Sequence, residues 1–210
     1  AERLAAYVRS GGALLLGPRS GVKEEEGAIV DALLPGPLRE VAGCYVEEYD
    51  AFSQVAGLEL RVRCPAGHLY RAHGLADVLV PEGNAEVSHR YEDHYYAGKP
   101  AVVRHVYGAG CCYYVGAFME EAGLIGFLRH DVLPRVGIAA LPALPESVEV
   151  SYRRKGGQRY AFYLNHGPAA ATVSLAQPGV ELLTQTAVHD RAEIPGFGVM
   201  IVKENYSSSI

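Results

Sequence analysis

The 210-residue sequence contains no tryptophan, two methionines and four cysteines, and it has no long uninterrupted apolar run. A membrane-spanning helix needs about 18 or more such residues, so we expect none here. The N-terminus also lacks the basic and then apolar segments of a secretory signal peptide. From these absences we expect a cytoplasmic protein.

Basic charge is scarce as well: 19 lysines and arginines stand against 24 aspartates and glutamates, for a formal net charge of -5. A protein without a basic excess is poorly suited to nucleic acid or to an anionic membrane, so we expect neither partner. With 49% hydrophobic and 20% charged residues, the chain can nevertheless bury a core. A complete (β/α)8 barrel is excluded, because it needs about 250 residues.

The four cysteines, Cys44, Cys64, Cys111 and Cys112, form no C-x2-C pair. This spacing indicates neither a dense disulfide framework nor a four-thiolate zinc site. Cys111 and Cys112 stand in the run CCYYVGAF, where a thiol packs as a small apolar side chain. We predict reduced, structural cysteines.

The first segment predicts a helix followed by a strand. Apolar residues recur at helical spacing over residues 4–8, and Gly11 and Gly12 end the helix. The apolar run at residues 13–16 then suits a strand that is covered on both faces. A helix that leads into such a strand is the repeating half of an α/β domain. The strand that should precede the helix is absent, so either the domain is irregular there or the chain starts within a larger protein.

Further strands are predicted at residues 44–50, 58–62, 76–80, 86–91, 101–107 and 111–115. The last two are joined by a glycine-rich turn and form a hairpin or a strand pair at a sheet edge. Two helices accompany these strands. One is short and stops at Gly43, and the other is amphipathic, covers residues 120–136 and ends near Pro134.

The composition changes at residues 138–145, where IAALPALP contains two prolines and no periodic pattern and therefore indicates a linker. Beyond it, short alternating runs separated by KGG, GPAA, QPG and GFG turns predict a small antiparallel β domain. We predict an α/β domain at residues 1–140 and an all-β domain at residues 145–204, followed by a frayed tail.

The sequence contains no complete catalytic motif of two kinds, a nucleophile elbow and a pair of facing carboxylates. Ser20 follows the first predicted strand in GPRSG, which is not the G-x-S-x-G pattern of a nucleophile elbow. Glu47 and Glu48 are adjacent, so on an extended strand their side chains point to opposite faces. A glycosidase needs two carboxyl groups that face one sugar. The acidic run at residues 24–26 fits a solvated loop, and we predict no catalytic residue.

Cys64, His68 and His73 show the spacing C-x3-H-x4-H, and His89 and His94 flank RYED. Zinc usually takes four ligands with a close pair on a tight turn or a helix. The first three residues fall in a segment with glycine and proline, where a loop with polar residues is expected. We therefore favour solvated or hydrogen-bonded histidines and expect no metal. No phosphate-binding glycine loop precedes a helix, and we expect no cofactor.

Tyrosine is the abundant aromatic residue, with 14 copies. Six of them lie close together in the sequence: Tyr91, Tyr95, Tyr96, Tyr107, Tyr113 and Tyr114. Tyrosines beside apolar residues are typical of protein interfaces. The same rings could instead fill the core, and the sequence leaves both interpretations open.

Several segments, taken in order, resemble a known family. The most specific are PGPLR at residues 35–39, VEE at 46–48, YAGKPA at 96–101 and FYLNH at 162–166. With the segments around them they resemble the trimerisation domain and the small C-terminal β domain of the glycoside hydrolase family 42 β-galactosidases. The resemblance covers nearly the whole chain.

The resemblance implies that the first domain has an amidotransferase-like (flavodoxin-like) fold, without amidotransferase activity, and builds a homotrimer. The family's two catalytic glutamates, and its zinc site where present, belong to a (β/α)8 barrel without a counterpart here. No catalytic residue is therefore carried over, and we expect this chain alone to be inactive. Its expected partners are further copies of itself or the missing barrel. Leu75 and residues 17–19 depart from the family pattern, on loops that face neighbours in the family.

Two other functions stay open from the sequence. A free-standing amidotransferase-like enzyme or small-molecule binding module would show a deep apolar pocket, with convergent polar groups, at the carboxyl ends of the strands. Carbohydrate binding by the β domain would show an exposed row of tyrosines on one sheet face. An assembly domain would instead expose an apolar, tyrosine-bearing patch.

Overall fold

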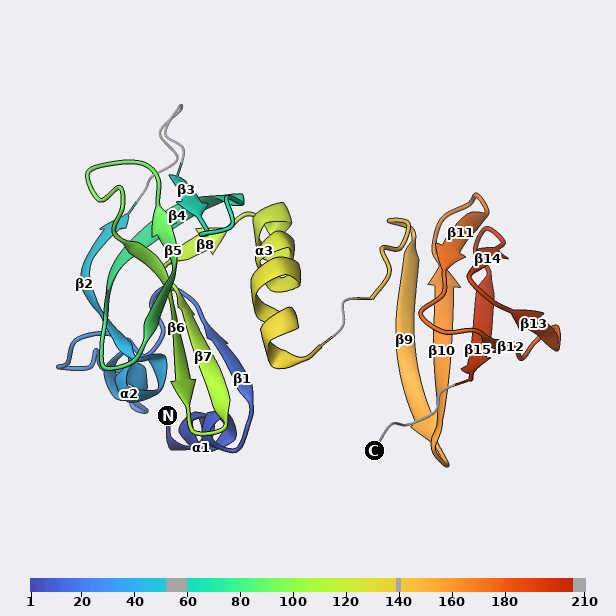
Figure 1. Ribbon diagram of the computed structural model, residues 1–210, viewed down its shortest axis with the longest axis horizontal. Helices are drawn as coiled ribbons and strands as arrows, with labels where there is room; N and C mark the ends of the chain where they lie inside the picture. The colour runs from blue at the N-terminus through green and yellow to red at the C-terminus, as the bar shows by residue number, and fades with distance from the viewer. Residues whose placement is uncertain (52–59, 139–140, 206–210) are drawn as a thin grey trace. The chain divides into compact units, whose positions relative to one another are not determined.

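The computed structural model of the chain describes residues 1–51, 60–138 and 141–205. Contacts divide the chain into two compact units, Ala1–Ile138 (unit 1) and Ala139–Ile210 (unit 2), each described by itself below (Figure 1). The predicted tail at residues 206–210 and the first part of the predicted strand at 58–62 lie outside the described residues. Among the helices that are described, none has the length and apolar composition needed to cross a membrane.

Unit 1 is built on an eight-stranded sheet. Its strands are β1 (Ala13–Leu16), β2 (Cys44–Ala51), β3 (Leu60–Arg63), β4 (Leu69–Pro81), β5 (Glu86–Tyr91), β6 (Pro100–Tyr107), β7 (Gly110–Val115) and β8 (Ala117–Met119). They lie in the order β1-β7-β6-β5-β3-β4-β2, and β8 pairs with β4. The β1–β7 pair is parallel, and the other pairs described in this sheet are antiparallel.

This topology confirms the expected order of a sheet-and-helix unit followed by an all-β unit. It does not confirm the expected flavodoxin-like arrangement of the first unit. A flavodoxin-like sheet consists mainly of parallel strands joined by crossover helices. Here most neighbours in the sheet are antiparallel, and hairpins join several of them, as at β6–β7. The amidotransferase-like (flavodoxin-like) label is therefore not confirmed.

The helical segments of unit 1 are short. They are α1 (Glu2–Arg9), the 3₁₀ helix η1 (Gly36–Leu38), α2 (Arg39–Ala42), α3 (Glu121–Phe127), the π-helix η2 (Leu128–Val132) and the 3₁₀ helix η3 (Pro134–Val136). α2 ends at Gly43, whose φ of 65° is the left-handed conformation that glycine adopts without strain. The amphipathic helix predicted over 120–136 is present, with its hydrogen-bond pattern changing at Leu128 and again at Pro134.

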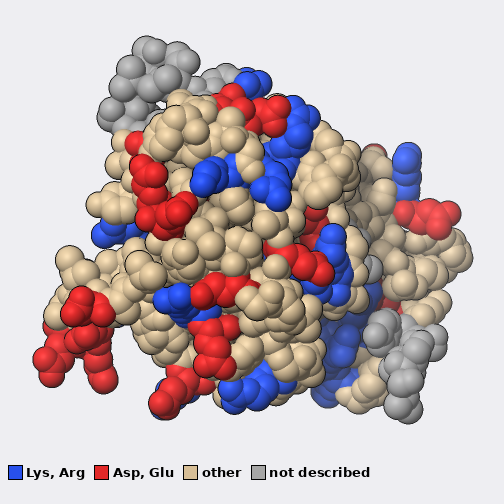
Figure 2. Space-filling model, turned by 60° about the vertical axis from the view of Figure 1, so that its left-hand side comes forward, with Lys and Arg blue, Asp and Glu red and all other residues tan. Residues whose placement is uncertain are grey.

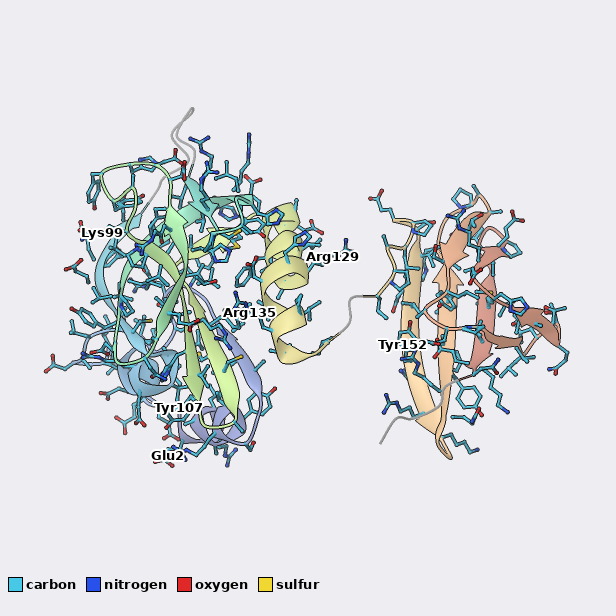
Figure 3. All side chains as sticks on the ribbon, viewed as in Figure 1. Glu2, Lys99, Tyr107, Arg129, Arg135 and Tyr152 are labelled. Atoms are coloured by element: carbon cyan, nitrogen blue, oxygen red, sulfur yellow. The ribbon has the colours of Figure 1, made fainter. Side chains whose placement is uncertain are left out.

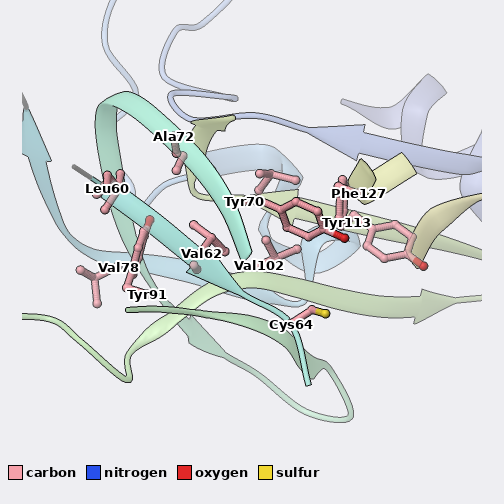
Figure 4. Packing of buried hydrophobic residues seen from close by; sticks show 14 of the residues in the cluster. Leu60, Val62, Cys64, Tyr70, Ala72, Val78, Tyr91, Val102, Tyr113 and Phe127 are labelled. Carbon is pink, nitrogen blue, oxygen red and sulfur yellow. The ribbon is translucent and has the colours of Figure 1, made fainter. Parts of the chain in front are cut away.

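The sheet is covered on both faces, and β7 shows why. Successive side chains of a strand point to opposite faces, so Cys111 and Tyr113 join one apolar cluster while Cys112 and Tyr114 join the other. The first, which we call the α3-side cluster, contains Phe127 of α3 (Figure 4). The second contains residues of α1 and α2. All four cysteines of the chain are buried and free, as predicted.

Two strands differ from the sequence expectation because pairing between distant segments decides them. β1 was expected to be covered on both faces, but it is an edge strand beside β7, and Leu15 is 40% exposed. β4 was predicted only over residues 76–80, whereas it begins at Leu69 because its first half pairs with β3 and β8. The segment expected to be a loop therefore places His73 within a strand.

Unit 2 is entirely β-structure, as predicted. A five-stranded sheet has the order β13-β12-β15-β10-β9, and β11 and β14 form a separate pair. The bounds are β9 (Val148–Lys155), β10 (Gln158–Asn165), β11 (Ala171–Ser174), β12 (Gly179–Glu181), β13 (Thr186–Val188), β14 (Arg191–Ile194) and β15 (Val199–Glu204). All of these pairs are antiparallel. Asn165 in the FYLNH segment is buried, and its Nδ2 donates to the carbonyls of Ala169 at 2.8 Å and Pro195 at 3.0 Å.

Candidate assembly surface

The structure divides the six clustered tyrosines. Four are core side chains with no more than 1% of their surface exposed: Tyr91, Tyr96, Tyr113 and Tyr114. Their hydroxyls are satisfied within unit 1, as for Tyr114, which donates to the buried Asp77 carboxylate at 2.8 Å. Burial raises the pKa of Asp77. For these four rings, burial favours the core interpretation over the interface.

Tyr95 and Tyr107 are the members of this group that reach the surface, and β6 separates them: Tyr95 lies in the loop before this strand and Tyr107 is its last residue. Figure 3 labels Tyr107 at one end and Lys99, which shares the β5–β6 loop with Tyr95, toward the other. Tyr107 already binds within the chain, because it accepts a hydrogen bond from Arg9 at 2.6 Å and donates to Glu40 at 2.9 Å. Tyr95 is 70% exposed. The six tyrosines therefore do not form one patch.

The Tyr95 surface, as we call the group Glu47, Glu48, Tyr95 and Lys99, joins two segments that are distant in the sequence. The hydroxyl of Tyr95 donates to the Glu48 carboxylate, and Lys99 Nζ lies 3.6 Å from Glu47 Oε2. VEE at residues 46–48 and the loop before β6 thus meet in space. The hydrogen bond to Glu48 raises the pKa of the exposed Tyr95 to about 12, so the phenol stays protonated at neutral pH.

Glu47 and Glu48 correct one expectation. On a regular strand adjacent side chains point to opposite faces, yet both glutamates contact the same loop. The pairing of β2 with β4 shifts between Val46 and Glu48, which leaves Glu47 as an extra residue in β2. Such a bulge redirects side chains. Both carboxylates are exposed and paired with Lys99 and Tyr95.

Contacts inside the β5–β6 loop hold the Tyr95 ring in position. It packs edge-on against buried Tyr96, with ring centroids 4.8 Å apart. Two residues before it, Asp93 accepts hydrogen bonds from the backbone N–H of Arg61 at 2.9 Å and from its guanidinium at 2.6 Å. The guanidinium hydrogen bonds lower the pKa of Asp93. The ring is therefore presented on a constrained loop.

A second exposed feature is an apolar groove of about 200 Å³ between β1, β8 and α3. Leu15 and Phe118, which are 40% and 46% exposed, line it together with Gly17 and Pro18. The departure from the family pattern at residues 17–19 thus lies partly at this groove. On the face that Figure 2 shows, charged side chains of both signs are scattered, often side by side.

The remaining sequence candidates are dispersed. Ser20 Oγ donates to the Gly17 carbonyl at 2.8 Å as a loop residue, and the acidic run at residues 24–26 is exposed. Cys64 is buried, whereas the exposed His68 stacks on His130 with ring centroids 4.7 Å apart. His73 stacks on Phe118, so the C-x3-H-x4-H residues form no common site.

The structure instead places Cys64 beside two residues that the spacing argument did not join to it, His89 and Asp131. Asp131 belongs to the predicted amphipathic helix, and nothing in the local pattern distinguished it from a solvated charge. His89 was visible only as one histidine beside RYED. Only the fold brings the three elements that carry these residues together, so no local sequence pattern could have identified the group.

The alternatives left open by the sequence find little support. A pocket at the carboxyl ends of parallel strands needs a parallel sheet, which unit 1 lacks. The pocket of about 570 Å³ beside β3 and β5 contains Cys64, but this thiol is only 2% exposed. In the described part of unit 2, Tyr152 and Tyr160 are half-buried and Tyr163 is buried. They form no exposed row.

Comparison with known proteins is consistent across both units. Residues 1–135 match the family model described as "Beta-galactosidase trimerisation domain", and residues 147–204 match "Beta-galactosidase C-terminal domain". β-Galactosidase BglY of Alicyclobacillus acidocaldarius is 36% identical over 211 residues, which cover 97% of this chain and 30% of that protein. BgaP of Planococcus sp. (strain L4) is 30% identical over 206 residues, covering 96% and 30%.

A solved β-galactosidase shares the fold. The crystal structure of β-galactosidase from Bacillus circulans sp. alkalophilus has a TM-score of 0.83 and 31% identity to this chain, covering 97% of it and 30% of the solved chain. This chain thus spans about 30% of the length of the relatives that it matches. The chain belongs to the glycoside hydrolase family 42 β-galactosidases, of which it carries the trimerisation domain and the C-terminal domain.

Proposed function

We propose that this chain is the non-catalytic assembly part of a β-galactosidase and that unit 1 joins three copies of it. The observation that carries the proposal is the match of residues 1–135 to a β-galactosidase trimerisation domain. A closed ring of three identical chains uses heterologous contacts, in which one surface of each copy meets a different surface of the next. Unit 1 offers two distinct exposed features for such a contact.

The Tyr95 surface and the apolar groove are those two features. Tyr95 is an exposed aromatic ring on a constrained loop, and aromatic residues are enriched among the side chains that contribute most to binding. The groove presents Leu15 and Phe118, apolar side chains that gain free energy when a second copy covers them. We propose that both are buried between copies.

We infer that catalysis belongs to a part of the protein outside this chain. Glycoside hydrolysis needs two carboxyl groups on either side of a glycosidic bond. The adjacent pair Glu47 and Glu48 is exposed and bound to Lys99 and Tyr95, which suits a surface role. The partner of this chain would be the catalytic barrel. A cytoplasmic location and an amidotransferase-like ancestry of unit 1 stay predictions.

Light scattering coupled to size-exclusion chromatography tests the assembly role. We expect a mass three times that of one chain, and a strict monomer at high protein concentration would contradict the proposal. A hydrolysis assay with a chromogenic β-galactoside tests the non-catalytic role. We expect no turnover by this chain, and turnover that follows the purified protein would contradict it.

A further inference from the structure

Cys64, His89 and Asp131 meet at the edge of the α3-side cluster from three different elements. Cys64 directly follows β3, His89 lies on β5, and Asp131 lies in η2. Each residue offers one candidate ligand atom: a sulfur, a ring nitrogen and a carboxylate oxygen. These three atoms lie within 4.8 Å of one another. Figure 4 shows Cys64 at the end of β3, near the rings of Tyr70 and Tyr113.

His89 carries a buried polar atom with an unmet requirement. Its side chain is 0% exposed, and Nε2 makes no hydrogen bond to the described residues. Asp131 Oδ2 lies 3.6 Å from this nitrogen. Buried polar atoms without a partner are rare in folded proteins, and an ion is one of the groups that satisfy them.

The spacing suits a shared metal ion. Two ligands on one tetrahedral zinc, with bonds of about 2.0–2.2 Å, lie about 3.4 Å apart. The 3.6 Å between His89 Nε2 and Asp131 Oδ2 is close to this value. The Cys64 sulfur belongs to the same group, within 4.8 Å of the other two atoms, and would have to approach to about 3.5 Å to share a tetrahedral ion.

Backbone irregularities in two separate elements direct these side chains. The pairing of β5 with β6 shifts on both sides of His89, between Val87 and His89 and between His89 and Arg90. Asp131 lies in the π-helical segment that interrupts the helix after α3. Both β-bulges and π-helical turns are frequent at functional sites, where they redirect a side chain.

Neighbouring groups fix the orientation of His89 and Asp131. His89 Nδ1 lies 2.9 Å from Ser88 Oγ, which leaves Nε2 as the nitrogen available to a ligand. Tyr70 donates a hydrogen bond to Asp131 at 3.0 Å, and Phe127 packs edge-on against the His89 ring. Hydrogen-bonded ligands held by packed rings are typical of metal sites.

Two pockets border the cluster. A pocket of about 570 Å³ is lined by Cys64, Ser88 and His89, and a second pocket of about 200 Å³ is lined by Ser88 and Asp131. Of the three side chains, Asp131 is the most exposed, at 13%, so an ion would enter from its side of the cluster.

We propose that Cys64, His89 and Asp131 bind one divalent transition-metal ion of the zinc type. Thiolate, imidazole and carboxylate are the ligand types that zinc takes in proteins, whereas calcium and magnesium take oxygen ligands. Three protein ligands leave a fourth position for water. The ion fastens the π-helical segment to the residue after β3 and to the interior of β5, a structural role that is independent of assembly.

Metal titration of the full chain, prepared without an affinity tag and treated with chelator, tests the site. With Zn²⁺ we expect one ion per chain and a higher melting temperature, because an ion that binds only the folded state stabilises it. With Co²⁺ we expect a thiolate-to-metal absorption band and the intense visible bands of tetrahedral cobalt. No binding, or cobalt binding without the thiolate band, would overturn the proposal.

The variants Cys64→Ala and Asp131→Asn should each lower zinc affinity at least tenfold, and Cys64→Ala should abolish the thiolate band. Cys111→Ala is the matched control, since Cys111 is buried in the same apolar cluster but is not one of the three grouped residues. It should keep both the band and the melting-temperature shift. Circular dichroism of each variant without metal reports folding separately. A folded Cys64→Ala variant that binds zinc as the parent does would contradict the assignment.

Discussion

The Tyr95 hydroxyl donates a hydrogen bond to the carboxylate of Glu48, across 47 positions of sequence. The contact exists because β2 bulges at Glu47 and because the Asp93–Arg61 pair holds the β5–β6 loop. It joins two of the segments that carry the family resemblance into one exposed surface, and it makes Tyr95 the side chain most suited to test assembly by mutation.

Replacing Tyr95 with alanine should weaken association of the chain. A buried aromatic contact at an interface contributes about 2 kcal/mol or more, so we expect association to weaken by roughly thirtyfold or more per contact. Sedimentation velocity over a dilution series measures this effect. Tyr7→Ala is the control, because Tyr7 is another exposed tyrosine of unit 1, 52% exposed on α1. Equal association of the two variants would remove Tyr95 from the proposed contact.

The Asp93–Arg61 pair should make the stability of unit 1 depend on acid pH. The hydrogen bonds from Arg61 lower the pKa of Asp93, so the unfolded chain binds the proton more tightly than the folded chain does. The stabilisation is therefore complete above the unfolded value of about 3.9 and is lost as the pH falls through the lower folded pKa.

Asp93→Asn should cost about 1–2 kcal/mol at about pH 7 and less at about pH 2, because the native carboxyl loses its charge as the pH falls through its lowered pKa. Urea unfolding followed by circular dichroism at the two pH values measures the difference. A cost that is the same at both values would show that the charge of Asp93 does not contribute.

Glu204 in unit 2 is 1% exposed and forms an ion pair with Arg159. Removing one partner leaves a poorly solvated charge, so Glu204→Gln should destabilise unit 2 by about 3 kcal/mol. The double variant Glu204→Gln with Arg159→Gln should cost less than the sum of the two single variants. Chemical denaturation of all four proteins provides the comparison, and strict additivity would rule out the coupling.

Asn165 should be essential to the β10–β11 connection. Its side chain donates to the Ala169 and Pro195 carbonyls and accepts from the Gly167 N–H at 3.0 Å. Asn165→Ala removes these three part-buried hydrogen bonds and should cost about 1–3 kcal/mol. Asn205→Ala, at an exposed position, should change stability by less than about 0.5 kcal/mol. Thermal unfolding of both variants distinguishes the two cases.

The local sequence pattern was sufficient to predict an element where both faces of a strand are buried, and to predict its end where a glycine stops a helix. The run CCYY in β7 predicted a strand, and Gly43 predicted the end of α2. Pattern was insufficient where distant strands decide the structure. Pro65 and Gly67 suggested a loop that holds both His68 and His73, but pairing with β3 and β8 makes the segment a strand from Leu69 on, so that only His68 lies in the loop.

The candidate sites depend even more on distant contacts. Tyr96 is buried and Tyr95 is 70% exposed, although the two residues are adjacent in sequence and both hydroxyls bond to carboxylates of β2, so the difference comes from tertiary packing. Cys64, His89 and Asp131 come from three elements that no sequence spacing relates. The bulge at Glu47 likewise follows from the pairing of β2 with β4.

Sedimentation equilibrium of the intact chain over a range of protein concentrations tests the central claim most directly, because it measures both the number of copies and their affinity. The assembly function predicts a single species with three times the mass of the 210-residue chain at high concentration, dissociating on dilution. A chain that stays monomeric at every concentration would contradict it.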